Sequence, residues 1–300
     1  ATGSGGRAAE RIQPMRRAAP PAARPVVAIS WTGGKDCHLA LLRARRAGAR
    51  VAALVVFRPP LPPVDAAAHA QAADSGPFRA HPLRCQRAQA AALGLPLHEV
   101  VVDPATTDGD YLAAYANAIR ELKRKHVPAL SAIVTGDIDL VGSSKTNFVT
   151  DACARADCGV RCWLPLWGGA RQQLLAEMLD HYHFEIAFSC VKSPHFDQTW
   201  IGRQLNRATL ADMEQISHKT GLDLCGENGE YHTLVLRVPE LHGETRLVLN
   251  PPDVEELTGR PGQTPGEQWW TLSPEADLKS TRVAPSEENT ARLKQARTEV

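Results

Sequence analysis

The first ordered pattern along the chain is a short apolar run, a glycine turn and an amphipathic segment. Residues 26–29 (Val-Val-Ala-Ile) are uniformly apolar, as in a strand that is buried on both faces of a sheet. Residues 35–47 place leucines among arginines and end at Gly48, which predicts a helix closed by a glycine. Residues 51–57 predict a second strand. Strand, turn, helix and strand within about 30 residues form a βαβ unit, which implies a parallel sheet.

Helical and strand patterns continue to alternate beyond this unit. Up to residue 135 they predict helices at 82–93 and 111–126 and strands at 97–102 and 131–135. After residue 165 they predict helices at 172–181 and 208–220 and strands at 184–191 and 233–238. The proline-rich residues 58–64 predict a long loop, because proline lacks an amide donor and restricts the residue before it. The fold class is therefore α/β, an open parallel sheet with helices on both faces, plus a smaller α+β C-terminal domain.

These changes of pattern divide the chain into four parts. We expect a leader at 1–24, an α/β domain at 25–167, a smaller domain at 168–248 and an extended tail at 249–300. The leader is rich in Arg and poor in acidic residues and has no apolar stretch of secretory length. We interpret it as a disordered extension, although an organellar transit peptide has a similar composition. In the tail, only residues 269–272 (Trp-Trp-Thr-Leu) are able to bury much surface, so we expect these tryptophans to pin it.

Composition and charge narrow the classes of function. Hydrophobic residues make up 43% and charged residues 22% of the 300 residues, which is typical of a folded globular protein. The 34 basic and 33 acidic side chains give a net charge of +1, which disfavours a dedicated nucleic-acid or membrane-surface binder. The longest aliphatic run, residues 51–57, is far shorter than the roughly 20 residues that span a bilayer.

Cysteine usage points to a reducing compartment. The 7 cysteines are an odd number spread over a long chain, which favours free thiols and a cytoplasmic location. Cys153, Cys158 and Cys162 form a C-x4-C-x3-C run, but no CxxC pair accompanies it. We interpret these three as small buried residues on a helix rather than as metal ligands.

The glycine turn carries the clearest chemistry. It fits neither the Walker pattern nor the dinucleotide-binding glycine pattern. Gly33 and Gly34 nevertheless allow the backbone to approach an anion at the N-terminus of the following helix, which suits a pyrophosphate group. Lys35 supplies a point charge for phosphate oxygens, and Asp36 suits holding Mg²⁺. The structural alternative is an ordinary glycine turn in which Asp36 caps the helix.

Three further groups of residues and one histidine are candidates for chemistry. Gly136 and Asp137 follow a predicted strand, at the sheet edge where ligands bind in this architecture. Glu227 and Glu230 flank a glycine and could bind an amine, an ammonium or Mg²⁺, or orient a nucleophile; the alternative is a solvated acidic turn. Trp200, Gly202 and Arg203 could belong to a functional site, but they could equally form a helix start with a packed indole. His81 could face a nucleotide, but a lone loop histidine is more often solvated.

Several motifs in this sequence resemble those of a known family. Residues 30–37 (Ser-Trp-Thr-Gly-Gly-Lys-Asp-Cys) resemble the SGGxDS pyrophosphate (PP) loop of the N-type ATP pyrophosphatases, which cleave ATP between its α and β phosphates. Residues 226–233 (Gly-Glu-Asn-Gly-Glu-Tyr-His-Thr) are similar to the GEGGEYHT motif of the diphthine-ammonia ligase family. Between them, motifs at 135–138, 164–167 and 200–203 follow in the family's order. The resemblance spans about residues 26–240.

The resemblance implies a fold, a reaction and a set of site residues. The fold would be that of the adenine nucleotide alpha hydrolase-like (HUP-like) superfamily, with residues 25–167 as the ATP-binding domain. The reaction would activate the carboxylate of diphthine on elongation factor 2 with ATP and amidate it with ammonia, which leaves diphthamide, AMP and pyrophosphate. The implied ATP-binding residues are Ser30, Thr32, Gly33, Gly34, Lys35, Asp36, Cys37, Gly136 and Asp137. The implied substrate-binding residues are Gly202, Arg203, Gly226, Glu227, Asn228, Gly229, Glu230, Tyr231, His232 and Thr233. The implied catalytic residues are Lys35, Asp36, Glu227 and Glu230, with Asp36 as the Mg²⁺ ligand.

The sequence departs from the family pattern at a few positions. Thr32 replaces a Ser and keeps its hydroxyl, Cys37 replaces a Ser with a weaker donor, and Asn228 replaces a Gly in a conformation that Asn tolerates. Residues 141–147 lack the His-Arg-x-Trp segment that we associate with many members. Alternative functions are an N-type ATP pyrophosphatase acting on another carboxylate or amide, an enzyme that thiolates RNA through Cys37, and a nucleotide-binding module without turnover.

Overall fold

The computed structural model describes residues 24–60, 81–140, 144–249, 254–257, 266–273 and 277–283. The predicted leader and most of the predicted proline-rich loop lie outside these ranges. Among the described residues, no helix has the length and apolar character needed to cross a membrane.

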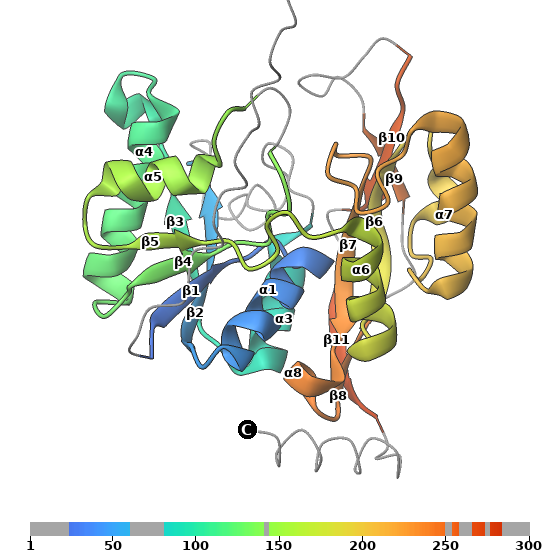
Figure 1. Ribbon diagram of the computed structural model, residues 1–300, viewed down its shortest axis with the longest axis horizontal. Coiled ribbons are helices and arrows are strands. Elements are labelled where there is room, and N and C mark those ends of the chain that lie inside the picture. The colour runs from blue at the N-terminus through green and yellow to red at the C-terminus, as the bar shows by residue number, and fades with distance from the viewer. Residues whose placement is uncertain are drawn as a thin grey trace, which may run out of the picture.

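A parallel sheet forms the N-terminal half of the molecule (Figure 1). Its strands, in spatial order, are β3 (Leu97–Val101), β2 (Arg50–Arg58), β1 (Val26–Ser30), β4 (Ala132–Val134) and β5 (Arg161–Trp163). Every neighbouring pair is parallel. The strand order reverses between β1 and β4, and ligands bind beyond the carboxyl ends of the strands at such a reversal. The predicted α/β fold class is therefore confirmed.

Helices cover both faces of this sheet. On one face lie α1 (Lys35–Arg46) and α3 (Leu83–Leu93), and on the other lie α4 (Tyr111–Glu121) and α5 (Phe148–Ala156). The alternation of β1 explains the two layers, because Val27 and Ile29 pack on the first face and Ala28 on the second. The predicted helix 111–126 continues past α4 as a π turn at Leu122–His126.

Two elements here were absent from the sequence prediction. Helix α5 is short, and Asn147 caps it by accepting the backbone N–H of Thr150 at 2.9 Å. Strand β5 has only three residues. The prediction that three cysteines share one helix was wrong, since Cys153 lies on α5, Cys158 follows it and Cys162 lies in β5. No group of three or more candidate metal-ligating side chains occurs in the described ranges.

The C-terminal half contains an antiparallel sheet and a strand pair. The sheet has the order β7 (Tyr231–Arg237), β6 (Glu185–Lys192), β10 (Trp269–Leu272) and β9 (Val254–Leu257). The pair joins β8 (Thr245–Leu249) to β11 (Leu278–Arg282). Helices α6 (Arg171–Ala176), α7 (Arg207–Thr220) and α8 (Pro239–His242) complete this half. The segment predicted as an extended tail thus supplies β9, β10 and β11, and Trp270 in β10 is buried.

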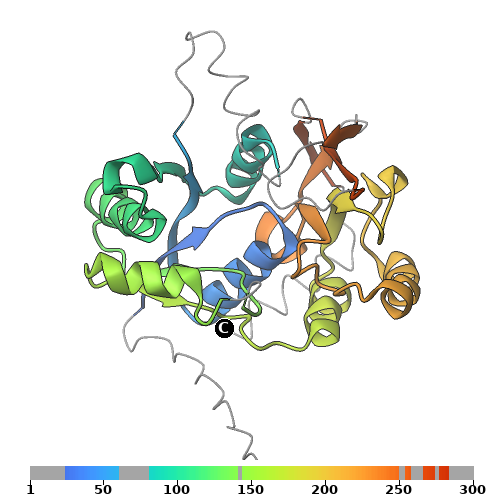
Figure 2. The same ribbon diagram turned by 90° about the horizontal axis from the view of Figure 1, so that it is seen from above.

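Helix α1 connects the two halves through a shared core. One cluster of buried side chains includes Leu39 and Leu42 of α1 together with Ile186 of β6 and Leu234 of β7. Figure 2 shows the parallel sheet and its helices on one side of the molecule and the C-terminal elements on the other. This packing brings the N-terminus of α1, at the carboxyl edge of the parallel sheet, against the start of β7.

Candidate functional site

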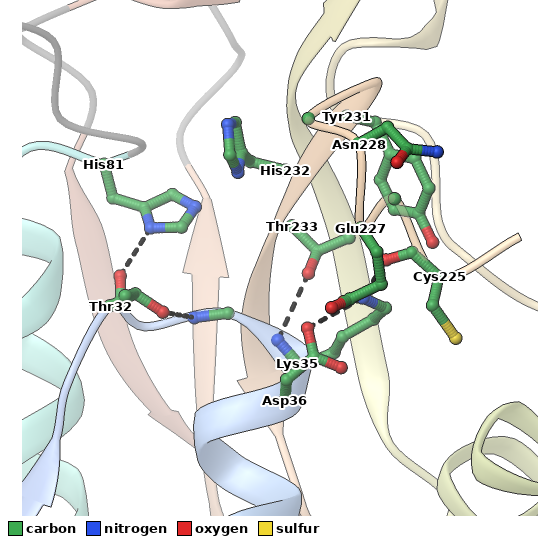
Figure 3. A pocket seen from close by; sticks show the side chains of 13 residues that line it. Thr32, Lys35, Asp36, His81, Cys225, Glu227, Asn228, Tyr231, His232 and Thr233 are labelled. Carbon is green, nitrogen blue, oxygen red and sulfur yellow. Dashed lines mark hydrogen bonds and ion pairs between the residues drawn. The ribbon is translucent and has the colours of Figure 1, made fainter. Parts of the chain in front are cut away.

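A cavity of about 540 Å³ opens where the glycine turn (residues 32–34) meets the acidic turn (residues 225–230), as Figure 3 shows. This volume lies in the usual range for small-molecule sites, roughly 300–1,000 Å³. The lining residues come from both turns, from the start of β7 and from the segment before α3. They are Thr32, Gly34, Lys35, Asp36, His81, Cys225, Gly226, Glu227, Asn228, Gly229, Tyr231, His232 and Thr233.

The glycine turn leaves the N-terminus of α1 without a side-chain cap. Gly33 has φ +87°, a conformation that L side chains rarely adopt, and a Cβ there would lie 2.5 Å from the Gln89 side-chain oxygen. Gly34 is the extended N-cap residue of α1 and provides no side-chain hydrogen bond. Asp36 therefore does not cap the helix, contrary to the structural alternative. The N-terminus of this 12-residue helix has no cap from its own N-cap residue and directs N–H groups and a positive dipole end toward an anion, although the Lys35 N–H donates to Thr233 Oγ1.

Lys35 joins the glycine turn to the acidic turn. Its Nζ donates to the Cys225 carbonyl oxygen at 2.6 Å and pairs with Asp36 Oδ2 at 2.8 Å, and the residue is only 3% exposed. Its backbone N–H donates to Thr233 Oγ1 at 3.2 Å. Burial acts to lower the pKa of Lys35, but the Asp36 carboxylate together with the nearby Tyr231 and Cys225 side chains outweighs it, and the pKa is raised. The ammonium group thus stays charged at the floor of the cavity.

The two carboxylate oxygens of Asp36 differ in their bonding. Oδ2 pairs with Lys35, whereas Oδ1 is buried and has no partner among the described residues. Burial is the main cause of the raised pKa of Asp36, and it outweighs the attraction of Lys35. A buried carboxylate oxygen without a donor is costly, and a cation at this oxygen would relieve that cost.

Glu227 and Glu230, which the sequence paired, have different environments. Glu227 lines the cavity, and burial together with the Asp36 carboxylate raises its pKa from 4.5 to about 7. A carboxyl group with this pKa exchanges protons readily near neutral pH. Figure 3 shows its carboxylate pointing toward Lys35 and Asp36.

Glu230 instead holds the acidic turn together. It is 2% exposed, and its carboxylate accepts the backbone N–H groups of Asp223 and Asn228, each at 2.9 Å. It also accepts the Asn228 side-chain amide at 3.1 Å. The alternative of a solvated acidic turn is wrong for Glu230. Its bonding suits a residue that shapes the turn, because a carboxylate with three donors has little capacity left for a substrate.

Cys37 does not resemble a reactive thiol. It is 3% exposed on α1, and its Sγ donates to the Gly34 carbonyl oxygen at 3.2 Å. Burial raises the pKa of this thiol to about 11. A thiol with so high a pKa carries almost no thiolate at neutral pH, and the thiolate is the nucleophilic form.

Three other predicted ATP-binding residues lie at the sheet edge and do not line the cavity. Ser30 ends β1, and Gly136 and Asp137 follow β4. Gly136 is required by close packing, since a Cβ there would lie 2.6 Å from the Asp36 backbone carbon. Asp137 accepts a hydrogen bond from the Asn147 side-chain amide at 2.6 Å. Of these three residues, Gly136 packs directly against the first turn of α1.

Gly202 and Arg203, predicted to bind substrate, do not line the cavity either. The Arg203 guanidinium stacks on the Trp200 ring at 4.0 Å and pairs with Asp212 at 3.0 Å. Trp200 is buried against Phe188. Residues 200–203 are therefore a helix end with a packed indole, which was the structural alternative, and not part of the cavity.

His81 was expected to be solvated, and this expectation was wrong. The residue is 2% exposed and lines the cavity. Its ring contacts the Thr32 carbonyl oxygen at 2.5 Å and Ser189 Oγ at 2.7 Å. The sequence offered one weak signal, because His81 directly precedes the helix that packs beside the glycine turn.

The fold and the cavity together define an α/β protein in which a glycine turn at a helix N-terminus faces a second, acidic turn. Comparison with known proteins agrees with this class. Residues 170–250 match the diphthamide synthase C-terminal domain. The resemblance to the diphthine-ammonia ligase family that the motifs indicated is thereby confirmed.

Individual relatives can be compared over most of the chain. A diphthine–ammonia ligase of Danio rerio is 26% identical over 224 residues, which cover 69% of this chain and 80% of the relative. A crystal structure described as a predicted subunit of tRNA methyltransferase from Methanocaldococcus jannaschii is 14% identical, with a TM-score of 0.35. It covers 71% of this chain and 97% of that chain. A likeness this low bears on neither the fold nor the function.

Proposed function

We propose that the protein is an ATP-dependent amide-forming ligase that activates the carboxylate of diphthine on elongation factor 2 and joins it to ammonia. The observation that carries the proposal is that one cavity holds both the N-terminus of α1 with Lys35 and a carboxyl group, Glu227, whose pKa is about 7. The first feature suits a pyrophosphate group and the second suits an amine. The similarity to a diphthine–ammonia ligase supports diphthine as the acyl substrate.

The residues present fit ATP with Mg²⁺. Gly33 and Gly34 allow phosphate oxygens to approach the backbone, and Lys35 provides the charge. Asp36 Oδ1, which is buried and has no partner in the part of the chain that the structure describes, would hold the metal. Mg²⁺ usually binds through one or two carboxylates, with phosphates and water as its remaining ligands. When bound there, the metal would supply charge that neutralises the phosphates.

In the first step, a carboxylate oxygen of the substrate attacks the α-phosphorus of ATP. The bond from this phosphorus to the bridging oxygen breaks, and pyrophosphate leaves with the bonding electrons. The N-terminus of α1 and Lys35 stabilise the charge that develops on the leaving group, because they are fixed before the reaction begins. The product is an acyl-adenylate.

In the second step, ammonia attacks the acyl carbon and AMP leaves. Ammonium must lose a proton before it can attack, and the nitrogen loses a further proton as the amide forms. Glu227 is the base that we assign to this transfer, since its raised pKa lets it hold a proton near neutral pH. The rate should therefore rise with pH through about 7, as Glu227 ionises.

The alternative in which Cys37 thiolates RNA finds no support in the site. The Cys37 thiol is buried under the glycine turn, and burial keeps its pKa at about 11. An enzyme of the same class that acts on another carboxylate stays an alternative. A nucleotide-binding module without turnover stays the alternative to an enzyme.

The test is to incubate the purified chain with ATP, Mg²⁺, ammonium and diphthine-bearing elongation factor 2. AMP, pyrophosphate and the amidated factor are the expected products, in equal amounts. ADP or phosphate as products would refute the proposal. Release of AMP and pyrophosphate with a different carboxylate alone would refute diphthine and retain the ligase class. ATP binding without any turnover would leave only the binding module.

A further inference from the structure

The side chains of His81, Gln86 and Gln89 form a carbonyl clamp around the glycine turn. Two donors meet on the Thr32 carbonyl oxygen, the His81 ring at 2.5 Å and the Gln86 amide at 3.1 Å. The Gln89 amide donates to the carbonyl oxygen of Gly33 at 2.9 Å. All three side chains are at least nine-tenths buried. The Gly33 carbonyl oxygen also accepts the backbone N–H of Val235 in β7 at 3.1 Å. Two successive carbonyls of the turn are therefore fixed, that of Thr32 by side chains alone and that of Gly33 by Gln89 together with β7.

Holding these carbonyls matters for an anion-binding turn. In a trans peptide, the carbonyl of one residue and the N–H of the next point in opposite directions. Fixing the Thr32 carbonyl on His81 therefore directs the Gly33 N–H away from the clamp. A carbonyl that rotated into the cavity would bring a partial negative charge toward a phosphate group. Gly33 and Gly34 have little torsional resistance to such a rotation, so other groups must prevent it.

All three side chains of the clamp present a hydrogen-bond donor, rather than an acceptor, to the glycine turn. The Thr32 carbonyl can only accept, so His81 Nδ1 carries the proton, and Nε2 accepts the hydroxyl of Ser189 in β6. Gln86 and Gln89 each leave a buried side-chain oxygen without a partner among the residues that the structure describes, while their nitrogens are bonded. Burial lowers the pKa of His81 to about 4, so the ring is neutral at neutral pH.

We propose that His81 is a positioning residue that, with Gln86 and Gln89, holds the glycine-turn carbonyls away from a bound pyrophosphate group and ties the turn to β6. This inference rests on the proposed function, because it assumes that the turn binds the pyrophosphate part of a nucleoside triphosphate. It predicts that loss of a clamp donor weakens pyrophosphate binding without unfolding the protein.

The test measures the Kd for inorganic pyrophosphate with Mg²⁺ by calorimetry, and the Tm of each variant. His81→Leu should weaken binding about tenfold, which corresponds to one well-placed hydrogen bond. His81→Gln should recover much of the affinity, because its amide can donate to Thr32 and accept from Ser189. His242→Leu is the control, since His242 is also buried and makes no hydrogen bond to the glycine turn; it reaches the turn only through the His38 ring, on which it stacks. It should bind pyrophosphate as the wild type does.

A second variant covers the case in which His81→Leu fails to fold. Gln86→Met keeps the size of the side chain, removes the other donor to Thr32 and removes the unpartnered oxygen, so it should fold and bind several-fold more weakly. Wild-type affinity in both Gln86→Met and a folded His81→Leu would overturn the clamp and leave the proposed function intact. Equal weakening by His242→Leu would also overturn it. Absence of pyrophosphate binding by the wild type would refute both.

Discussion

Replacing Glu227 by glutamine should make the protein more stable at alkaline pH and leave its stability unchanged at acid pH. Burial and the Asp36 carboxylate raise the pKa of Glu227 from 4.5 to about 7. A folded-state pKa above the unfolded value means that folding favours the protonated form. The wild type therefore has the full stability of this group below about pH 4.5 and loses it as the pH rises through about 7.

The size of the effect follows from that rise in pKa. The full difference corresponds to about 3 kcal/mol of unfolding free energy. Because the side chain is only partly buried, solvent screening should reduce this to about 1–2 kcal/mol. Glutamine has the same shape and cannot ionise. The variant should match the wild type at about pH 4.5 and exceed its unfolding free energy by about 1–2 kcal/mol at about pH 8.

Urea unfolding followed by tryptophan fluorescence, at several pH values, measures this difference. Glu244→Gln is the control, because Glu244 is exposed and does not line the cavity. A difference between Glu227→Gln and the wild type that is constant across the pH range would refute the reasoning. The same variant should lose amide formation, so a gain in stability should accompany a loss of function.

Three further substitutions test other parts of the site. Lys35→Met should weaken ATP binding at least about tenfold and lower the unfolding free energy by several kcal/mol, because it leaves the Asp36 carboxylate buried without its cation. Calorimetry measures the ATP affinity and urea unfolding measures the stability. Wild-type ATP affinity would contradict the assigned role. Cys37→Ser should keep activity within about twofold in the AMP-release assay, since a hydroxyl can also donate to the Gly34 carbonyl; complete loss would point to thiol chemistry. Gly136→Ala should cost about 1–3 kcal/mol, because its Cβ would meet the backbone of Asp36; an unchanged Tm would show that α1 moves freely.

Patterns that depend on neighbouring residues were predicted well. The apolar run of β1, the glycine turn and the helix after it occur where the sequence placed them, because strand burial and a positive φ leave direct traces in residue type. Strand β7 begins at Tyr231, two residues before its predicted start, since the acidic turn passes directly into the sheet.

Features that depend on contacts between distant residues were not predictable. The burial of His81 depends on Thr32 and on Ser189, which is 108 residues away. Glu227 and Glu230 look equivalent in the sequence, and only the folded turn separates a cavity-lining carboxyl from one that accepts three hydrogen bonds. Helix α5 and strand β5 are too short to show a period, so only their packing defines them.

The burial of α1 by both halves has a consequence for how the molecule can be taken apart. Leu39 and Leu42 of α1 share one core with side chains of β6, β7 and β11. A fragment beginning at residue 170, where the family match begins, would expose the apolar surface that α1 covers. A fragment ending near residue 167 would in turn expose the apolar face of α1 that packs against these strands. Chimeras with a relative should therefore fold only when α1 and the strands that face it are exchanged as a single block.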